Sequence, residues 1–299
     1  MSLPDFFEKM EKKELKKSPA ALFILSCLVV VFYSCNVINP TEPVPSYFQI
    51  DSIDLNTDYS TEGSATSKIS DAWVLVDNKY LGTYGMPVTF PAIGEGIHKI
   101  SFRAGIQVNG MSDNRAAYPP FTTFDTTLNF TPGTVFNIHP IINYKEGTVF
   151  KQIEDFDDGS LSLVSTSSGF APLNITLASD PNAFENNSGH IELTDNAPEF
   201  QVASSDTFSL PVFTPVYLEL NYKTDHEFSI GVFENGSSVV QTPLVYVRPS
   251  SVWKKIYVNI SELGGITGGN VVYKIYLKGV KISSQPTATF YFDNLKVLY

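Results

Sequence analysis

From residue 46 onward, apolar and polar residues alternate in short runs that are separated by Gly, Pro, Asn and Asp. Alternation with a period of two is typical of strands with one buried face, and apolar residues at helical spacing are rare in this part of the chain. In residues 98–106, for example, Ile100, Phe102 and Ala104 alternate with polar residues, so one face of this strand is expected to be buried. The pattern therefore predicts an all-β protein.

The strand signals fall into two groups. Residues 47–148 have the size of an immunoglobulin-like β-sandwich, about 100 residues. Residues 149–299 carry at least seven further strand signals, which favours a two-sheet jelly-roll β-sandwich. The expected strands are 47–55, 72–77, 98–106, 126–130 and 134–144 in the first domain, and 190–193, 216–223, 228–233, 243–248, 253–260, 271–277 and 288–299 in the second.

Two stretches resemble known domain families. The segment "WVLVDNKYLGTYGMPVTFPAIGEGIHKISFRAG" (73–105) resembles PEGA-type modules, which implies an envelope-associated spacer without catalysis. In the second domain, "DFDDG" (155–159), the strand beginning at Trp253 and "YFDNLKV" (291–297) resemble carbohydrate-binding-module jelly rolls. The fold expected from these resemblances is an immunoglobulin/PEGA-like sandwich followed by a jelly roll.

The second resemblance also implies a possible cofactor. In those modules an acid near the first strand and the aspartate of the last strand can share a structural Ca²⁺, and the matching positions are Asp157 and Asp293, with Asp155 and Asp158 as further candidates. Carboxylate oxygens are the ligands that Ca²⁺ prefers, and ligands from both chain ends would close the domain. The alternative is that Asp157 and Asp158 form a turn while Asp293 caps an edge.

The N-terminal region predicts export and lipid attachment. The basic run "KKELKK" (12–17) precedes an apolar run from Ala20 to Tyr33, which is typical of a secretory signal and too short to span a bilayer comfortably. "FYSC" (32–35) resembles a bacterial lipobox. That resemblance implies removal of residues 1–34 and modification of Cys35 by diacylglycerol and an N-linked acyl chain such as palmitate, which together anchor a protein stably. An uncleaved N-terminal membrane helix is the alternative.

Residues 35–46 contain Pro40, Pro43 and Pro45 and are expected to form an extended tether between the lipid and the first sandwich. Asn36 follows Cys35 where an aspartate would favour inner-membrane retention in Gram-negative lipoproteins, so the resemblance implies the outer membrane and leaves the leaflet open. The formal net charge of −11 opposes binding to a phosphate backbone, so nucleic acid is not expected as a partner.

Motifs for catalysis are absent from the sequence. The four histidines have no partners at metal or nucleophile–base spacing, and neither a "G-x-S-x-G" nor an "H-E-x-x-H" motif occurs. We therefore expect a non-catalytic envelope lipoprotein that binds or scaffolds a protein or glycan partner. Two alternatives stay open: a glycan-binding component of a surface-polysaccharide system, and a hydrolase that uses Glu219 or Glu227.

Two further features bear on a ligand site. The insertion Asn109–Phe121 is long for a hairpin loop, and such loops often carry function, although packing through Tyr118 and Phe121 explains it as well. Trp73 and Trp253 are expected in the cores, because both lie within strand patterns. Tyr217, Tyr222, Tyr246 and Tyr257 could line a sheet face instead, but this set is too diffuse to assign a site. The sequence therefore identifies no ligand-binding residue.

Overall fold

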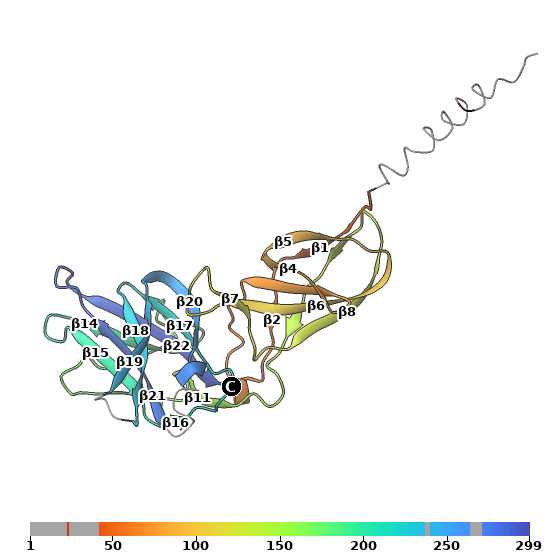
Figure 1. The fold of residues 1–299 in the computed structure, drawn as a ribbon. Coiled ribbons are helices and arrows are strands. Elements are labelled where there is room, and N and C mark those ends of the chain that lie inside the picture. Colours follow the sequence, from red (N-terminus) through yellow and green to blue (C-terminus); the bar gives the residue numbers. More distant parts are fainter. Residues whose placement is uncertain (1–22, 24–41, 237–239, 264–270) are drawn as a thin grey trace, which may run out of the picture. The chain divides into compact units, whose positions relative to one another are not determined.

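The computed structural model describes residues 23, 42–236, 240–263 and 271–299, and Figure 1 shows their fold. Pro45–Tyr299 form one compact unit. Apart from Phe23, the predicted signal peptide lies outside the described residues, as does Cys35. No helix within the described residues is long and apolar enough to cross a membrane.

The first part of this unit is a small sandwich of short strands. Its elements are β1 (Ser46–Ile50), β2 (Asp54–Leu55), α3 (Tyr59–Glu62), β3 (Asp71–Val76), β4 (Lys79–Gly85), β5 (Val88–Ala92), β6 (Gly96–Gln107), β7 (Arg115–Ala117), β8 (Thr123–Phe130), β9 (Val135–Asn137) and β10 (Ile141–Ile142). One sheet has the order β5-β1-β9 and another the order β4-β3-β6-β7, with β8 paired to β6, while β2 pairs with β10.

The alternation of apolar and polar residues along the strands explains how this sandwich forms its core. Phe48, Phe90, Phe102 and Phe130 are at most 2% exposed and pack into one core. The β3–β4 hairpin turns at Asp77 and Asn78, which both adopt positive φ angles (49° and 63°). Asn and Asp tolerate this conformation better than most residues, so the sequence supports a tight turn here.

The second part carries two six-stranded sheets. Its strands are β11 (Phe150–Glu154), β12 (Leu163–Ser165), β13 (Asn174–Thr176), β14 (Ser188–Leu193), β15 (Glu199–Ser204), β16 (Phe208–Ser209), β17 (Tyr217–Thr224), β18 (Phe228–Glu234), β19 (Gln241–Val247), β20 (Ser250–Asn259), β21 (Val272–Val280) and β22 (Ala288–Leu298). One sheet runs β13-β14-β22-β17-β20, with β11 on β22, and the other runs β12-β15-β21-β18-β19, with β16 on β21. We call them the front sheet and the back sheet, respectively.

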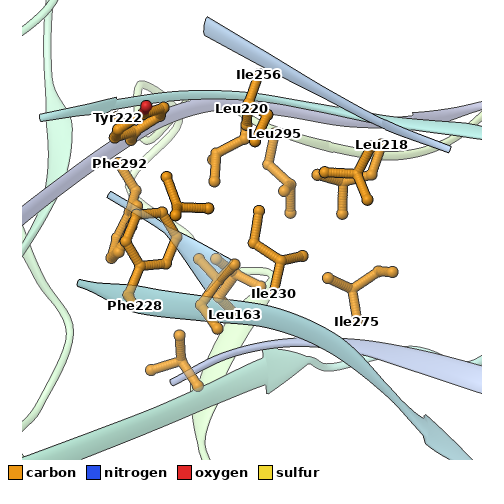
Figure 2. Close-up of a cluster of buried hydrophobic side chains, with 14 of the residues drawn as sticks. Leu163, Leu218, Leu220, Tyr222, Phe228, Ile230, Ile256, Ile275, Phe292 and Leu295 are labelled. Atoms are coloured by element: carbon orange, nitrogen blue, oxygen red, sulfur yellow. The ribbon is translucent and has the colours of Figure 1, made fainter. Parts of the chain in front are cut away.

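Every second side chain of these strands enters the space between the two sheets. Figure 2 shows Leu218 and Leu220 of β17 above Ile230 of β18 and Ile275 of β21, and all four residues are 0% exposed. The prediction of an all-β chain with a two-sheet second half is therefore confirmed.

The two parts share a packed boundary. All strand pairs stay on one side of residue 149, but an isolated bridge joins Val108 to Tyr257. Tyr217, Tyr257 and Leu298 of the second part belong to the core cluster of the first. The outward face of the front sheet is thus partly covered by the first sandwich.

Candidate functional site

The outward face of the back sheet carries a groove across β21, β18 and β19, which we call the sheet groove. Its volume is about 580 Å³, within the range of about 300–1,000 Å³ that is usual for small-molecule sites. Register places Lys278, Ser229 and Tyr246 side by side across the three strands. Because side chains alternate along a strand, this row faces away from the core.

The next row of the groove consists of Tyr276, Gly231 and Pro243. A Cβ atom at Gly231 would lie 2.4 Å from the ring and hydroxyl of Tyr276, so glycine is what allows this tyrosine to lie across β18. Phe233 stacks on Tyr276 with 4.8 Å between ring centroids and 25° between ring planes. The groove floor is therefore a fixed aromatic surface.

Tyr246 on the edge strand β19 is 68% exposed and forms the side of this groove. Ser229 and Lys278 line the groove in the same row as Tyr246, and Gln241 lines it farther along β19. His226 also lines it and is 6% exposed; Asp225 lies 2.8 Å from its Nδ1, and its Nε2 has no hydrogen-bond partner among the described residues. An exposed aromatic ring beside a few polar groups can orient a ligand that is both apolar and hydroxylated.

A second cavity, which we call the loop pocket, has a volume of about 530 Å³. It lies between the end of β6 with the loop that follows it, which contributes Asn109–Asp113, and the strands β19 and β20 of the second part. Tyr246 lines this pocket as well as the sheet groove. The predicted insertion Asn109–Phe121 is thus divided between two roles: Tyr118 and Phe121 are 3% exposed and pack in the core, whereas its first five residues line a cavity.

The boundary between the two parts contains a buried charge network that the sequence did not predict. Glu219 is 0% exposed, and its Oε2 lies 2.9 Å from Nζ of Lys255. Tyr118 and Tyr144 of the first part donate hydrogen bonds to the same carboxylate at 2.8 and 3.0 Å. Burial opposes ionisation, but Lys255 and Lys296 together hold the pKa of Glu219 below its ordinary value.

The lysines of this network hold the first part through backbone carbonyls. Lys296 is 0% exposed and donates to the Ser64 carbonyl at 2.6 Å, and Lys255 donates to the Thr66 carbonyl at 2.8 Å. Burial, and then the positive charge of Lys255, lower the pKa of Lys296 to about 7.

This burial bears on the hydrolase alternative. Glu219 is sealed inside the boundary, whereas Glu227 is exposed at the sheet groove. The two carboxylates that the sequence singled out therefore do not share a cleft.

The two tryptophans are only half-buried, and neither belongs to a core cluster, so the core prediction for them is wrong. Trp253 lies on the outward face of the front sheet, where its Nε1 donates to the Asn182 carbonyl at 3.0 Å and its ring contacts Phe184 at 5.0 Å. The strand alternation that buries Ile256 leaves Trp253 on the opposite face.

Of the two predicted calcium positions, Asp293 is the buried one. Burial raises the pKa of Asp293 to about 8, with smaller contributions from the charges of Glu185 and Asp157. Ser188 donates to Oδ2 of Asp293 at 2.7 Å, and the Asn187 backbone N–H donates to Oδ1 of Asp157 at 3.0 Å.

Within the described residues, no group of three or more His, Cys, Asp or Glu side chains is arranged to hold a metal ion. Asp155 accepts a hydrogen bond from Tyr59 at 2.8 Å, and Asp158 accepts from Ser160, so these two carboxylates are engaged in turns and loop contacts. Calcium therefore stays a prediction that rests on Asp157 and Asp293.

Comparisons with known proteins add a likeness of fold. No family model matches the chain. No curated protein matches it either. Among solved structures, a family 61 carbohydrate-binding module in complex with β-1,4-galactotriose has a TM-score of 0.32 and 13% identity over 48% of this chain and 92% of that one.

Two further modules give similar values. A family 11 carbohydrate-binding module from Clostridium thermocellum, in complex with a β-1,3-1,4-mixed-linked tetrasaccharide, has a TM-score of 0.32 and 18% identity over 50% of this chain and 95% of that one. A family 29 carbohydrate-binding module has a TM-score of 0.35 and 9% identity over 50% of this chain and 88% of that one. Because identity and TM-score are both low, the ligands of those modules are not transferred to this chain; its structural neighbours are β-sandwich carbohydrate-binding modules.

Proposed function

We propose that this protein is a non-catalytic glycan-binding lipoprotein of the bacterial outer membrane. The observation that carries the binding role is the sheet groove, in which the exposed Tyr246 lies in one row with Ser229 and Lys278, and Tyr276 and Gln241 line the same groove. A sugar ring has apolar C–H faces and a rim of hydroxyls, so it needs such a combination of a flat aromatic surface and hydrogen-bonding groups.

Rigidity of the groove supports the same proposal. The absence of a side chain at Gly231 leaves space for the ring of Tyr276, and Phe233 stacks on that ring. Strand β18 pairs with β21 in unbroken register and with β19 in a register that shifts once, between Ile230 and Gly231. A preformed surface loses little conformational entropy on binding, which favours affinity for weakly interacting ligands such as sugars.

Replacing Tyr246 with alanine is expected to weaken glycan binding about tenfold, because loss of one aromatic contact removes on the order of 1.4 kcal/mol of binding free energy. The ligand would first be identified on a glycan array with the wild-type protein, and affinities would then be measured by titration calorimetry. Tyr80→Ala is the matched control, since Tyr80 is also exposed (61%) but lies on β4 of the first part. An array without hits, or equal effects of the two substitutions, would contradict the proposal.

The membrane placement rests on Cys35, and it has its own test. Cys35→Ala is expected to abolish labelling by radioactive palmitate, because the lipid is attached at Cys35. It is also expected to stop removal of residues 1–34, because cleavage follows modification of the Cys35 thiol. Cys27→Ala is the control and should leave labelling and processing unchanged, because Cys27 lies within the predicted apolar run. Persistent labelling of the Cys35 variant would refute the anchor.

A further inference from the structure

The loop pocket gathers positive charge in an otherwise acidic protein. Four cationic side chains line it, Lys68, Arg248, Lys254 and Lys255, against the single carboxylate of Asp113. The chain as a whole has a formal net charge of −11. Such a local reversal of sign in a concave site focuses the electrostatic potential and raises the local concentration of anions.

Three of these cations have no carboxylate partner within the part of the chain that the structure describes. Lys255 is engaged by Glu219, but none of the ion pairs found among the described residues involves Lys68, Arg248 or Lys254. Burial, and then the like charge of Lys254, lower the pKa of Lys68, which is the effect expected of cations that lack a counter-ion. The pocket is therefore electrostatically complementary to an anionic group.

The wall contributed by the first part is held in place by direct contacts to β20. The Asn109 backbone N–H donates to the Tyr257 carbonyl at 2.8 Å, and the Asn109 side-chain oxygen accepts from the Asn259 backbone N–H at 2.9 Å. Gly110 follows with a φ angle of 71°, and a Cβ atom there would lie 3.2 Å from Ile256. The loop is thus positioned on β20 before any ligand arrives.

Tyr246 connects this pocket to the sheet groove, because it is a lining residue of both cavities. A ligand that stacks on Tyr246 in the groove can place a neighbouring unit in the loop pocket. Gln107, Asn109 and Ser112 supply further hydrogen-bonding groups there. These properties fit a polar, anionic unit of a chain molecule, and not an apolar ligand.

We propose that the loop pocket binds the carboxylate of a uronate unit in an acidic glycan, with Lys254 and Arg248 as its recognition residues. This inference rests on the proposed glycan-binding function and names the ligand class. The guanidinium of Arg248 can hold a carboxylate through two parallel hydrogen bonds, while Lys254 and Lys68 act as point charges beside it.

The probe for this proposal is tetragalacturonate, compared with its methyl ester, which keeps the same sugars and removes the charges. Titration calorimetry of the wild-type protein is expected to give an affinity for tetragalacturonate about tenfold above that for the ester at low salt. Raising the NaCl concentration should reduce this preference, because salt screens charges at exposed sites.

Lys254→Gln and Arg248→Gln should each lower the preference for the charged tetramer about three- to tenfold, without changing binding of the ester. Both side chains are exposed, so the variants keep the fold, which an unchanged melting temperature verifies. Lys79→Gln, at an exposed position on β4 of the first part that lines neither cavity, is the matched control and should keep the preference.

Equal binding of tetragalacturonate and its ester, absence of binding by both, or an unchanged preference in the Lys254 and Arg248 variants would overturn the uronate proposal. Binding of neutral glycans that depends on Tyr246 would in those cases leave the proposed function standing. If the wild-type protein bound no glycan on the array, the proposed function would be overturned as well.

Discussion

Replacing Glu219 with glutamine is expected to destabilise the folded protein by about 3–5 kcal/mol, the usual consequence of breaking a buried ion pair from one side. Glutamine has nearly the same shape as glutamate, so the substitution leaves no cavity. The lost negative charge is therefore the cause of the expected loss of stability. Lys255, whose side chain is 2% exposed, would lose its one acidic partner among the described residues. Urea unfolding of the purified protein measures the difference.

A matched control and a rescue variant make this prediction specific. Glu192→Gln changes an exposed carboxylate on β14 of the same sheet and should alter stability by less than about 0.5 kcal/mol. Glu219→Gln combined with Lys255→Met should recover much of the loss, because the unpaired charge is then removed. If the glutamine variant at position 219 were as stable as the control, the network would not hold the two parts together.

The charges of this network were visible in the sequence, but their burial was not. Glu219 and Lys296 each lie between two apolar residues that fill the jelly-roll core, and Lys255 precedes Ile256 of that core. This pattern predicts a solvent-facing side for all three. The first sandwich covers this side, bringing Tyr118 and Tyr144 to Glu219 from 101 and 75 residues away in the chain. Periodicity reports which face of a strand is polar, and not what covers that face.

Strand alternation was sufficient for most of the fold. The segments around Leu218, Ile230 and Ile275 were predicted as strands, and each belongs to the sheets that Figure 2 shows. Strand β15 (Glu199–Ser204) was not predicted, although it is a central strand of the back sheet beside β21. Its residues from Phe200 onward are buried on both faces, so the alternation that marked the other strands is weak there.

The candidate site could not be assembled from the sequence for a different reason. Tyr246, Ser229 and Lys278 come from three strands, and only the register of β18 with β19 and β21 makes them neighbours. The loop pocket needs in addition the docking of Asn109 on β20, a contact across 150 residues. Two signals were available. The unusual length of the insertion identified the loop but not its partner, and Tyr246 was one of four tyrosines expected to be able to line a sheet face.

In the absence of metal ions, Asp293→Asn is expected to make the protein more stable than the wild type at pH 9. The pKa of Asp293 is raised from 3.8 to about 8, so the folded protein favours the neutral carboxyl group. Between these two values the folded state binds more protons than the unfolded state, and stability falls as the pH rises. Above about pH 8 the loss is complete, and asparagine avoids it because it carries no charge.

The expected gain of the Asp293→Asn variant is about 1–3 kcal/mol at pH 9, allowing for partial relaxation around the buried charge, since one pKa unit corresponds to about 1.4 kcal/mol. The gain should shrink as the pH falls through 8 and vanish near pH 4, where the wild-type carboxyl is neutral in both states. Unfolding curves in EDTA at several pH values measure it. Asp206→Asn, at an exposed position, is the control and should show no such pH dependence.

Calcium would reverse this order. A cation bound to Asp157 and Asp293 replaces the missing positive charge, so excess Ca²⁺ should stabilise the wild type at pH 7–9 by mass action and leave the Asp293→Asn variant nearly unchanged. The Asp293 carboxylate would then destabilise the folded protein without the metal and stabilise it when the metal is bound. If Ca²⁺ shifts neither unfolding curve while the pH effect in EDTA is present, Asp293 is a buried acid held by Ser188 and not a calcium ligand.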